Sequence, residues 1–314
     1  MSTKKVIVTG GAGFIGSNLV DELSKQHSVT VVDDLSTGKM ENIAHLKNID
    51  FILGSITDPG LLKRAFEGAE YVFHLAALPS VQRSVDDPLA SNAANVDGTL
   101  NVLLAARDCG VKKVVYASSS AVYGDEPTLP KREDMMPGPL SPYAVGKITG
   151  EYYARVFSEL YGLRTVCLRY FNVYGPRQDP ASEYSAVIPI FISRILAGKA
   201  PVIFGDGNQT RDFAFVRDVV RANILSMEKE QAEGVFNIAC GKRTSLNQLA
   251  GIIMEIVGLK AGLIHEKPRP GDIQDSLADI SAARIELGYE PEYDLMSGLK
   301  ETVDWFGGRQ RKEA

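Results

Sequence analysis

Tyr143 and Lys147 lie four residues apart in the segment LSPYAVGK, which spans residues 140–147. Residues at this spacing share one face of an α-helix, and the Ser-Pro pair just before them is typical of a helix start. A phenol has a pKa of about 10 in water, so a tyrosine acts as a base at neutral pH only where positive charge stabilises the phenolate. Lys147 would supply such charge. A tyrosine–lysine pair on its own is more often a surface contact, so its meaning depends on its surroundings.

The run KKVVYASS, residues 112–119, is typical of a buried strand, and serines occupy positions 118–120 at its end. Ligands of parallel α/β sheets bind at the carboxyl ends of the strands. A serine hydroxyl at that edge, with Tyr143 and Lys147 on the helix that follows, would form a proton-transfer unit. The serine would hold a substrate hydroxyl while Tyr143 takes its proton and a hydride passes to a nicotinamide cofactor.

The glycine-rich segment VTGGAGFIG, residues 8–16, follows the first strand-like run and opens a helix-like one. Its spacing Gly11-x-Gly13-x-x-Gly16 fits the fingerprint of a dinucleotide-binding turn, where backbone N–H groups at a helix N-terminus meet a pyrophosphate. Asp33 ends the next strand, seventeen residues after Gly16. A carboxylate there would bind ribose hydroxyls and repel a 2′-phosphate, which favours NAD over NADP. The alternative for Asp33 is an ordinary turn residue at a strand end.

The elements that would position these residues alternate along the first half of the chain. β-branched, continuously apolar runs, as expected in a parallel sheet covered on both faces, occupy residues 4–9, 28–33, 49–54, 71–76, 112–119 and 164–171. Amphipathic segments between them cover 14–26, 59–67, 95–109 and 143–160, and later helices are expected at 245–258 and 295–306. This rhythm predicts a Rossmann-type, doubly wound α/β domain over residues 1–175. A smaller mixed α/β lobe over 176–314 would bind the substrate, with more than one chain crossing between the lobes.

The composition excludes several classes of function. The 314 residues are 45% hydrophobic and 23% charged, with a net charge of −5, which argues against a nucleic-acid or anionic-membrane partner. No apolar run is long enough to span a bilayer, and the N-terminus enters a strand without a signal peptide. The three cysteines are widely spaced and the four histidines are isolated, so neither a disulfide framework nor a metal site is expected. We expect a cytoplasmic protein.

Together these features resemble the extended short-chain dehydrogenase/reductase family, and within it the nucleotide-sugar 4-epimerases. The likeness covers essentially the whole chain, through TGGAGFIG, VFHLAA, NVDGTLNVL, SSSAVYG, SPYAVGK, LRYFNVYGPRQ, GDGNQTRDFAFVRD and RPGDIQDSLAD. The segments SVQRSVDDP, RQDPASEYSAVIP and SLADIS narrow it to the UDP-N-acetylglucosamine 4-epimerase group. The resemblance implies a bound NAD that each catalytic cycle regenerates, and a UDP-sugar whose C4 is inverted through a transient 4-keto sugar.

The resemblance also implies roles for individual residues. Ser119 would be the hydroxyl partner with Ser120 beside it, Tyr143 the acid and base, and Lys147 the group that holds the nicotinamide ribose. The implied cofactor contacts are Gly10, Gly13, Phe14, Ile15, Gly16, Asp33, Ser36, Gly38, Leu75, Ala76, Ala77, Asn95, Tyr143 and Lys147. One departure is Ser55, which stands where the family usually has an aspartate near the adenine. A hydroxyl can still hydrogen-bond the adenine, and Asp58 lies close by in the sequence.

On the substrate side, the resemblance assigns Asn172 to the sugar-nucleotide, Arg211 and Arg269 to the diphosphate, and Asp272 to the uridine ribose. Guanidinium groups suit a diphosphate well. Ser80, Gln178 and Ala186 would line the sugar pocket together with Ser276 and the serines at 119 and 120. Family members restricted to glucose and galactose have a bulky tyrosine where this chain has Ser276. A small residue leaves room for an N-acetyl group at C2, although a loop serine would look the same.

Several alternatives stay open from the sequence. A 4,6-dehydratase is disfavoured because Ser120 and Ala121 replace the Asp-Glu pair that such enzymes use after the strand-end residue. A UDP-glucuronate epimerase or decarboxylase of the same family is the second enzyme hypothesis, and a catalytically silent NAD-binding sensor is the third. Helices 95–109 and 143–160 are apolar on more than one face. We therefore expect a homodimer through these helices, although burial within one chain would explain the same pattern.

Overall fold

The computed structural model describes residues 3–180, 186–268 and 273–313. Its main body is a seven-stranded parallel sheet in the order β11-β6-β5-β4-β1-β2-β3. The strands are β1 (Lys5–Thr9), β2 (Ser28–Asp33), β3 (Ile49–Leu53), β4 (Tyr71–His74), β5 (Lys113–Ser119), β6 (Arg164–Tyr170) and β11 (Gly234–Ile238). The order reverses beside β1, so a ligand crevice is expected where β1 and β4 end.

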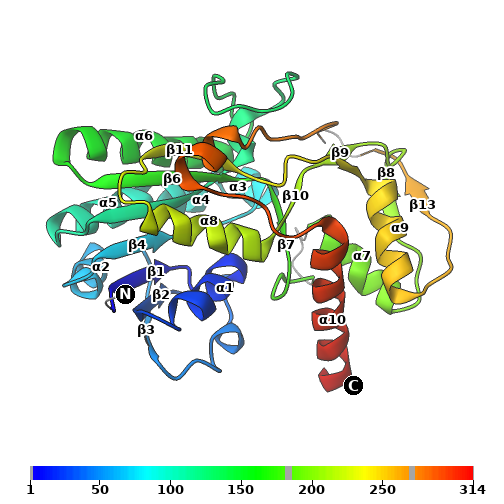
Figure 1. The fold of residues 1–314 in the computed structure, drawn as a ribbon, viewed down its shortest axis with the longest axis horizontal. Helices are drawn as coiled ribbons and strands as arrows, with labels where there is room; N and C mark the ends of the chain where they lie inside the picture. Colours follow the sequence, from blue (N-terminus) through cyan, green and yellow to red (C-terminus); the bar gives the residue numbers. More distant parts are fainter. Residues whose placement is uncertain (1–2, 181–185, 269–272, 314) are drawn as a thin grey trace.

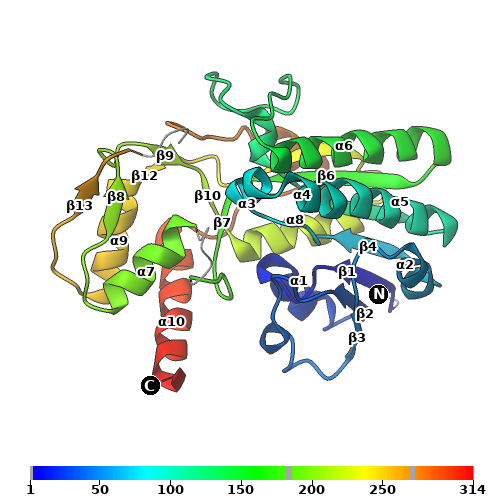
Figure 2. The same cartoon turned by 180° about the vertical axis from the view of Figure 1, so that it is seen from behind.

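Helices cover both faces of this sheet, as Figures 1 and 2 show. One face carries α1 (Phe14–Leu23) and α8 (Val216–Glu228), and the other carries α2 (Pro59–Phe66), α5 (Gly98–Asp108) and α6 (Pro142–Tyr161). Each face has its own buried apolar cluster, with Leu19 and Val219 in one and Leu62 and Val102 in the other. The predicted doubly wound α/β fold is confirmed.

A smaller lobe stands beside the sheet (Figure 1). It contains α7 (Val187–Leu196), α9 (Leu246–Val257) and α10 (Leu295–Glu313), which share a third apolar cluster. Its short strands pair two by two: β8 (Val202–Phe204) with β13 (Ile264–Glu266), and β9 (Thr210–Arg211) with β12 (Thr244–Ser245). Between lobe and sheet, β7 (Asn172–Tyr174) pairs with β10 (Phe213–Phe215). The chain leaves the sheet after β6, returns for α8 and β11, and leaves it again.

The remaining elements are short. They are the 3-10 turns η1 (Met40–Asn42) and η3 (Ser120–Tyr123), the helices α3 (Val81–Asp86) and α4 (Pro88–Asn92), and the π-helical segments η2 (Ala93–Asp97) and η4 (Ala283–Leu287). The segment η2 interrupts a helix that would otherwise run from α4 into α5. Single π-helical turns inside α-helices are frequent at functional sites.

Candidate active site

The structure brings Ser119, Tyr143 and Lys147 together at the end of β5. Helix α6 starts at Pro142, and the side chain of its N-cap residue, Ser141, accepts a hydrogen bond from the Ala144 N–H. This start places Tyr143 on the first turn, where its phenol interacts with the Ser119 side chain. Lys147, one turn later, is buried and donates from Nζ to the Ala117 carbonyl oxygen at 2.7 Å. The three side chains thus meet at one strand end.

The chain alone does not make Tyr143 a base at neutral pH. Burial raises the pKa of Tyr143, and its hydrogen bond with Ser119 opposes this rise. Burial also lowers the pKa of Lys147 to about 8, while the nearby Glu151 carboxylate acts in the opposite direction. A lowered pKa of the phenol, as expected from the sequence, requires the positive charges of both Lys147 and an oxidised nicotinamide. In the chain by itself, desolvation of the phenol outweighs the effect of Ser119, so the pKa of Tyr143 is raised.

Lys147 lies between two aromatic rings. Its Nζ is 5.1 Å from the ring centroid of Tyr116 and 5.8 Å from that of Tyr143, within range of cation–π attraction. Tyr116 lies beneath α6 because Gly150 leaves space there, and a Cβ at Gly150 would overlap the Tyr116 hydroxyl. Sequence reasoning did not single out Tyr116, although it stands in the strand that ends in the serines.

A buried ion pair lies behind these residues. Arg169 on β6 donates to both carboxylate oxygens of Glu151, at 2.9 and 2.7 Å, and both side chains are almost fully buried. Ser118 donates to the same carboxylate at 2.5 Å. Fork-shaped pairing of this kind fixes geometry as well as charge. It anchors α6 to the strands one turn below Lys147.

The glycine-rich turn has the tight geometry that a pyrophosphate site requires. Gly10 has a φ of +73°, and a Cβ there would lie 2.6 Å from the Ala76 nitrogen. A Cβ on Gly16 would overlap the Gly10 carbonyl oxygen. Gly13 is the N-cap of α1, and no side chain caps this helix. Phe14 and Ile15 form its first turn, so its N-terminal amides face the space above the turn and suit an anion.

Asp33 ends β2 beside this turn. Its carboxylate accepts hydrogen bonds from the Ala12 N–H at 2.9 Å and the Leu35 N–H at 2.8 Å. Burial raises its pKa, and these two bonds act against the rise. Gly38 packs closely here, since a Cβ would lie 2.8 Å from the Asp33 Oδ1. Ser36 is exposed, and its N–H donates to Asp34.

Two further residues near the expected adenine position, Ser55 and Asp58, form hydrogen bonds with residues close to them in the sequence. Ser55 accepts a hydrogen bond from the Thr57 hydroxyl at 3.0 Å. Asp58 is the N-cap of α2 and accepts from the Leu61 N–H at 3.0 Å. The Asp58 side chain is therefore engaged in helix capping, which leaves Ser55 as the nearer polar group for this position.

Asn95 and the residues after β4 form a connected polar edge. The Asn95 side chain makes two hydrogen bonds with the backbone of Leu78. Its Oδ1 accepts from the Leu78 N–H at 2.9 Å, and its Nδ2 donates to the Leu78 carbonyl oxygen at 3.2 Å. This fixes the partly buried segment of Leu75, Ala76 and Ala77 above the glycine turn. The π-helical turn of η2 carries Asn95 to this position, and Gly146 of α6 packs against it.

A buried histidine, missed in the sequence, supports the same edge. His74 Nδ1 lies 2.8 Å from the Thr9 hydroxyl, and Nε2 lies 3.0 Å from the Thr99 hydroxyl. Because Thr99 donates its own hydrogen to the Asn95 carbonyl oxygen at 2.7 Å, its oxygen must accept from His74 Nε2–H. Burial lowers the pKa of His74 to about 3, so the ring is neutral. It joins β1, β4 and α5 without adding charge.

Among the expected substrate residues, Arg211 and Ser276 lie on adjacent segments. Arg211 Nη1 donates to the carbonyl oxygens of Thr210 and Gln274, and the Ser276 N–H donates to Thr210 at 3.1 Å. Both are partly buried. Arg269 and Asp272 lie outside the described residues.

The other expected substrate residues come from four separate elements. Asn172 Nδ2 donates to the Asp212 carbonyl oxygen at 3.4 Å, and Gln178 Nε2 donates to the Val173 carbonyl oxygen at 3.2 Å. Ser80 caps α3, Ser120 begins η3 beside Ser119, and Ala186 is exposed at the start of α7. Ser84 of α3, which the sequence argument missed, accepts from the Tyr143 N–H at 3.0 Å and so links α3 to the start of α6.

The described part of the chain holds no group of three or more histidine, cysteine or acidic side chains that could bind a metal ion. Within the same residues, none of the helices combines the length and the apolar character that crossing a bilayer requires.

Comparison with known proteins identifies the family to which the chain is related. The model of the NAD dependent epimerase/dehydratase family matches residues 6–239. The UDP-glucose 4-epimerase of Mycolicibacterium smegmatis is 42% identical over 313 residues, covering 98% of this chain and 100% of that protein. A solved UDP-N-acetylglucosamine 4-epimerase from Methanobrevibacter ruminantium, in complex with UDP-N-acetylmuramic acid, is similar with a TM-score of 0.95 and 46% identity, covering 98% and 100% of the two chains. The UDP-glucuronic acid 4-epimerase of Bacillus cereus, in complex with UDP-glucuronic acid and NAD, gives a TM-score of 0.89 and 34% identity, covering 97% and 99%.

Proposed function

Because the chain belongs to the NAD-dependent epimerase/dehydratase family, we propose that it interconverts UDP-N-acetylglucosamine and UDP-N-acetylgalactosamine by inverting C4. The family resemblance drawn from the sequence is confirmed, and the protein is an epimerase that uses NAD. UDP-glucose and UDP-galactose form the second proposed substrate pair. The observation that carries the proposal is the meeting of Ser119, Tyr143 and Lys147 at the end of β5, beside the glycine turn.

The residues around the glycine turn fit NAD. Side chains at Gly10 and Gly16 would overlap neighbouring backbone atoms, so this tight turn requires glycine, as a pyrophosphate-binding turn does, and the buried Asp33 suits ribose hydroxyls. Tyr143 and Lys147 would hold the nicotinamide end. Bound NAD supplies a reversible hydride acceptor and a positive charge when oxidised.

The chain's own residues would handle the proton. Ser119, which interacts with the Tyr143 phenol, would share a hydrogen bond with the C4 hydroxyl of the sugar and align it with Tyr143. Tyr143 would take that proton and later return it. Lys147 would keep the phenolate stable, and the bond from Nζ to the Ala117 carbonyl oxygen fixes its position. Arg211 would hold the diphosphate, so that the sugar ring itself stays free to present either face.

The preference for an N-acetylated sugar rests on Ser276 and on one relative. Ser276 is small and partly buried beside the Arg211 strand, which is compatible with a pocket wide enough for a C2 substituent. The relative with 46% identity was solved with UDP-N-acetylmuramic acid, a sugar that carries an N-acetyl group. Extra pocket volume usually broadens specificity, since differences of this size are worth about 1–3 kcal/mol. This supports both proposed substrate pairs.

The test uses purified protein without added cofactor. UDP-N-acetylglucosamine, UDP-glucose and UDP-glucuronic acid are incubated separately, and the products are resolved by chromatography. We expect UDP-N-acetylgalactosamine to form from the first without added NAD. Conversion of UDP-glucose alone would contradict the role given to Ser276. Conversion of none of the three would favour a catalytically silent NAD-binding sensor.

The second candidate function is that of a UDP-glucuronate epimerase or decarboxylase. It is favoured by the Bacillus cereus relative, which is similar over 97% of this chain at 34% identity. The same proton-handling residues would serve that reaction, so only the groups around C6 would differ. Epimerisation of UDP-glucuronic acid, or loss of carbon dioxide from it, would establish this alternative in the assay above.

We also propose that the protein is a homodimer through α6. Val145, Tyr152, Val156 and Leu160 lie at spacings of seven, four and four, so they form one stripe along the helix, and all are exposed, Leu160 by 70%. Covering such a stripe with a second copy would bury apolar area from both chains.

The dimer is tested by light scattering on the wild type and on Tyr152→Glu/Leu160→Glu. We expect a dimer that this double substitution dissociates. Ile285→Glu is the matched control, because Ile285 is an equally exposed apolar side chain, at 83%, on η4 instead of α6. A monomeric wild type would contradict the proposal.

A further inference from the structure

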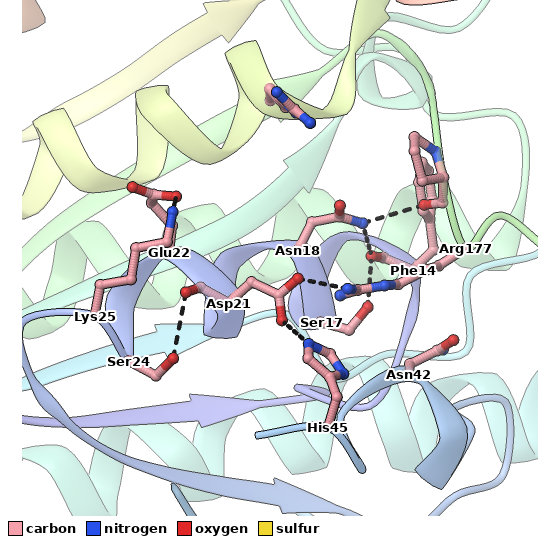
Figure 3. A network of polar contacts seen from close by, with 12 residues as sticks. Phe14, Ser17, Asn18, Asp21, Glu22, Ser24, Lys25, Asn42, His45 and Arg177 are labelled. Atoms are coloured by element: carbon pink, nitrogen blue, oxygen red, sulfur yellow. Dashed lines mark hydrogen bonds and ion pairs between the residues drawn. The ribbon is translucent and has the colours of Figure 1, made fainter. Parts of the chain in front are cut away.

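The segment Gly175–Pro180, which follows β7, lies along the outer face of the cofactor-binding helix α1 (Figure 3). Asn18 Nδ2 donates to the Pro176 carbonyl oxygen at 3.2 Å and to the Phe14 carbonyl oxygen at 2.9 Å. One turn further along, Arg177 Nη2 donates to Asp21 Oδ2 at 2.5 Å. Phe14, Asn18 and Asp21 share one helix face, so the segment makes a continuous contact with α1.

Arg177 has an unusual backbone conformation. Its φ is +73°, and among the described residues only one other non-glycine residue, Leu35, has a positive φ. Side chains other than glycine rarely adopt this region, and non-glycine residues there concentrate at functional sites. The Arg177 side chain is only 16% exposed, and it forms an ion pair with Asp21.

The neighbouring Gln178 has a buried acceptor without a partner. Its Nε2 donates to the Val173 carbonyl oxygen, but its Oε1 has no hydrogen bond within the described part of the chain. The Arg177 Nη1 atom is also buried and unbonded there. Buried polar atoms normally have partners, so two orphans in consecutive residues indicate a position that water or a ligand completes. A sugar hydroxyl could donate to Gln178 Oε1.

A second ion pair ties the far end of the same segment. Lys39 Nζ lies 2.6 Å from Asp179, and the Lys39 N–H donates to the Ala12 carbonyl oxygen in the glycine turn at 3.0 Å. Asp21 is also bonded through Oδ1 to His45 Nε2 at 2.9 Å. Gln178 therefore lies between two ion-paired residues, Arg177 and Asp179, whose partners Asp21 and Lys39 belong to the surroundings of the expected dinucleotide site.

We infer that Asp21 and Arg177 are positioning residues, which hold Gln178 at the substrate site by fixing its segment to α1. The inference rests on the proposed function, in which Gln178 contacts the sugar. Neither Asp21 nor Arg177 touches substrate in this arrangement. Their ion pair places the acceptor, and through α1 it connects the sugar site to the cofactor site.

The experiment compares Asp21→Asn with the wild type in two measurements. Hydrogen exchange reports the backbone amides of Gly175, Arg177, Gln178 and Asp179, and steady-state kinetics give kcat and KM for UDP-N-acetylglucosamine. We expect faster exchange confined to this segment, and a KM raised by about five-fold with kcat within about two-fold, as for loss of a partly buried ion pair. Glu22→Gln is the matched control: Glu22 neighbours Asp21 on α1, and its partner Lys25 is exposed (Figure 3).

A second variant separates positioning from stability. Arg177→Gly removes the ion pair but suits a φ of +73°, so we expect an unchanged or higher Tm together with the raised KM. The charge-reversed pair Asp21→Arg/Arg177→Asp should recover part of the wild-type KM.

Two results would overturn the inference. One is unchanged exchange in residues 175–180 for Asp21→Asn. The other is an unchanged KM for Arg177→Gly in an enzyme whose wild type turns over. If the wild type converts no UDP-sugar, the proposed function fails by itself. The exchange measurement and the affinity for UDP-N-acetylglucosamine, compared between wild type and Asp21→Asn, then decide whether the ion pair holds a binding segment.

Discussion

Tyr143 sits where burial raises its pKa, and the Ser119 hydroxyl is its hydrogen-bonding partner in the described site. A protonated phenol at this position is suited to donate a proton. To accept one, it needs the positive charges of Lys147 and of an oxidised cofactor. In the proposed cycle Tyr143 would donate a proton in one half and accept one in the other, and the positive charge of oxidised NAD would favour the second step.

We predict that Tyr143→Phe lowers kcat by about 10²–10⁴-fold, because it removes the atom that carries the proton and leaves the ring in place. NAD should remain bound, since the glycine turn and Asp33 are untouched. The measurement is the rate of UDP-N-acetylgalactosamine formation alongside the cofactor content of the purified variant. Activity within ten-fold of the wild type would exclude Tyr143 as the acid and base.

We assign the alkaline limb that is expected in the pH profile to Lys147. Burial lowers its pKa to about 8, so its charge disappears as the pH rises through this value, and the phenolate loses its support. We predict that kcat/KM falls above about pH 8, or at a lower pH where bound NAD adds its own positive charge. Lys147→Arg keeps its charge throughout this range and should flatten the alkaline fall. An identical fall in this variant would assign the limb to another group.

At the scale of elements, α6 owes its position to glycines that allow close contact. Gly146 packs on Asn95 and Gly150 packs on Tyr116, so the helix that carries Tyr143 and Lys147 lies directly against η2 and β5. Sequence periodicity predicted this helix, because its cap signal and apolar spacing are local. It did not predict how near the helix lies to Tyr116, because that depends on a strand 34 positions away along the chain.

We predict that Gly150→Ala lowers both Tm and kcat, because the added Cβ would overlap the Tyr116 hydroxyl and displace the ring beside Lys147. Gly251→Ala in α9 is the matched control, since no atom lies within 4 Å of its Cβ position. That substitution should raise the free energy of unfolding by about 0.5–1 kcal/mol through helix propensity. Thermal unfolding and steady-state rates check both. Equal behaviour of the two variants would contradict the packing argument.

The six strands expected from the sequence all appear in the sheet, with bounds shifted by at most two residues. Continuous apolar runs made them recognisable. The seventh, β11, was missed, because GVFNI lies far along the chain and becomes a strand only by pairing with β6. The π-helical turn at Asn95 was also missed, since nothing local distinguishes it from α-helix. Motifs could identify Ser119, Tyr143 and Lys147, whereas Glu151, Arg169 and His74 gain their roles only from contacts between distant segments.

At the scale of the whole molecule, Asp212 joins three segments where the chain crosses between sheet and lobe. Its carbonyl oxygen accepts from the Asn172 N–H. Its carboxylate accepts from the N–H groups of Cys240, Gly241 and Ala278, at 2.9, 3.0 and 3.2 Å. The residue is fully buried. Through Asp212, the segment that carries Arg211 is therefore joined to the start of β7, to the residues that follow β11 and to Ala278.

We predict that Asp212→Asn destabilises the protein more in acid than at neutral pH. Burial raises the pKa of Asp212 from 3.8 to about 6, although its backbone hydrogen bonds act against the rise. At a pH between 3.8 and about 6, Asp212 is protonated in the native chain but has released its proton in the unfolded chain. The contribution of this group to the free energy of unfolding is therefore complete below about pH 4 and is lost as the pH rises through 6.

Asparagine does not titrate, so the gap in Tm between wild type and Asp212→Asn should be larger at pH 4.5 than at pH 7.5. Glu255→Gln, on the exposed side of α9, should follow the wild-type curve at both values. A gap that widens toward neutral pH would mean that the native carboxyl group stays ionised in acid. The four backbone N–H groups near it, including that of Lys242, would then bind an ionised carboxylate and not a protonated carboxyl group.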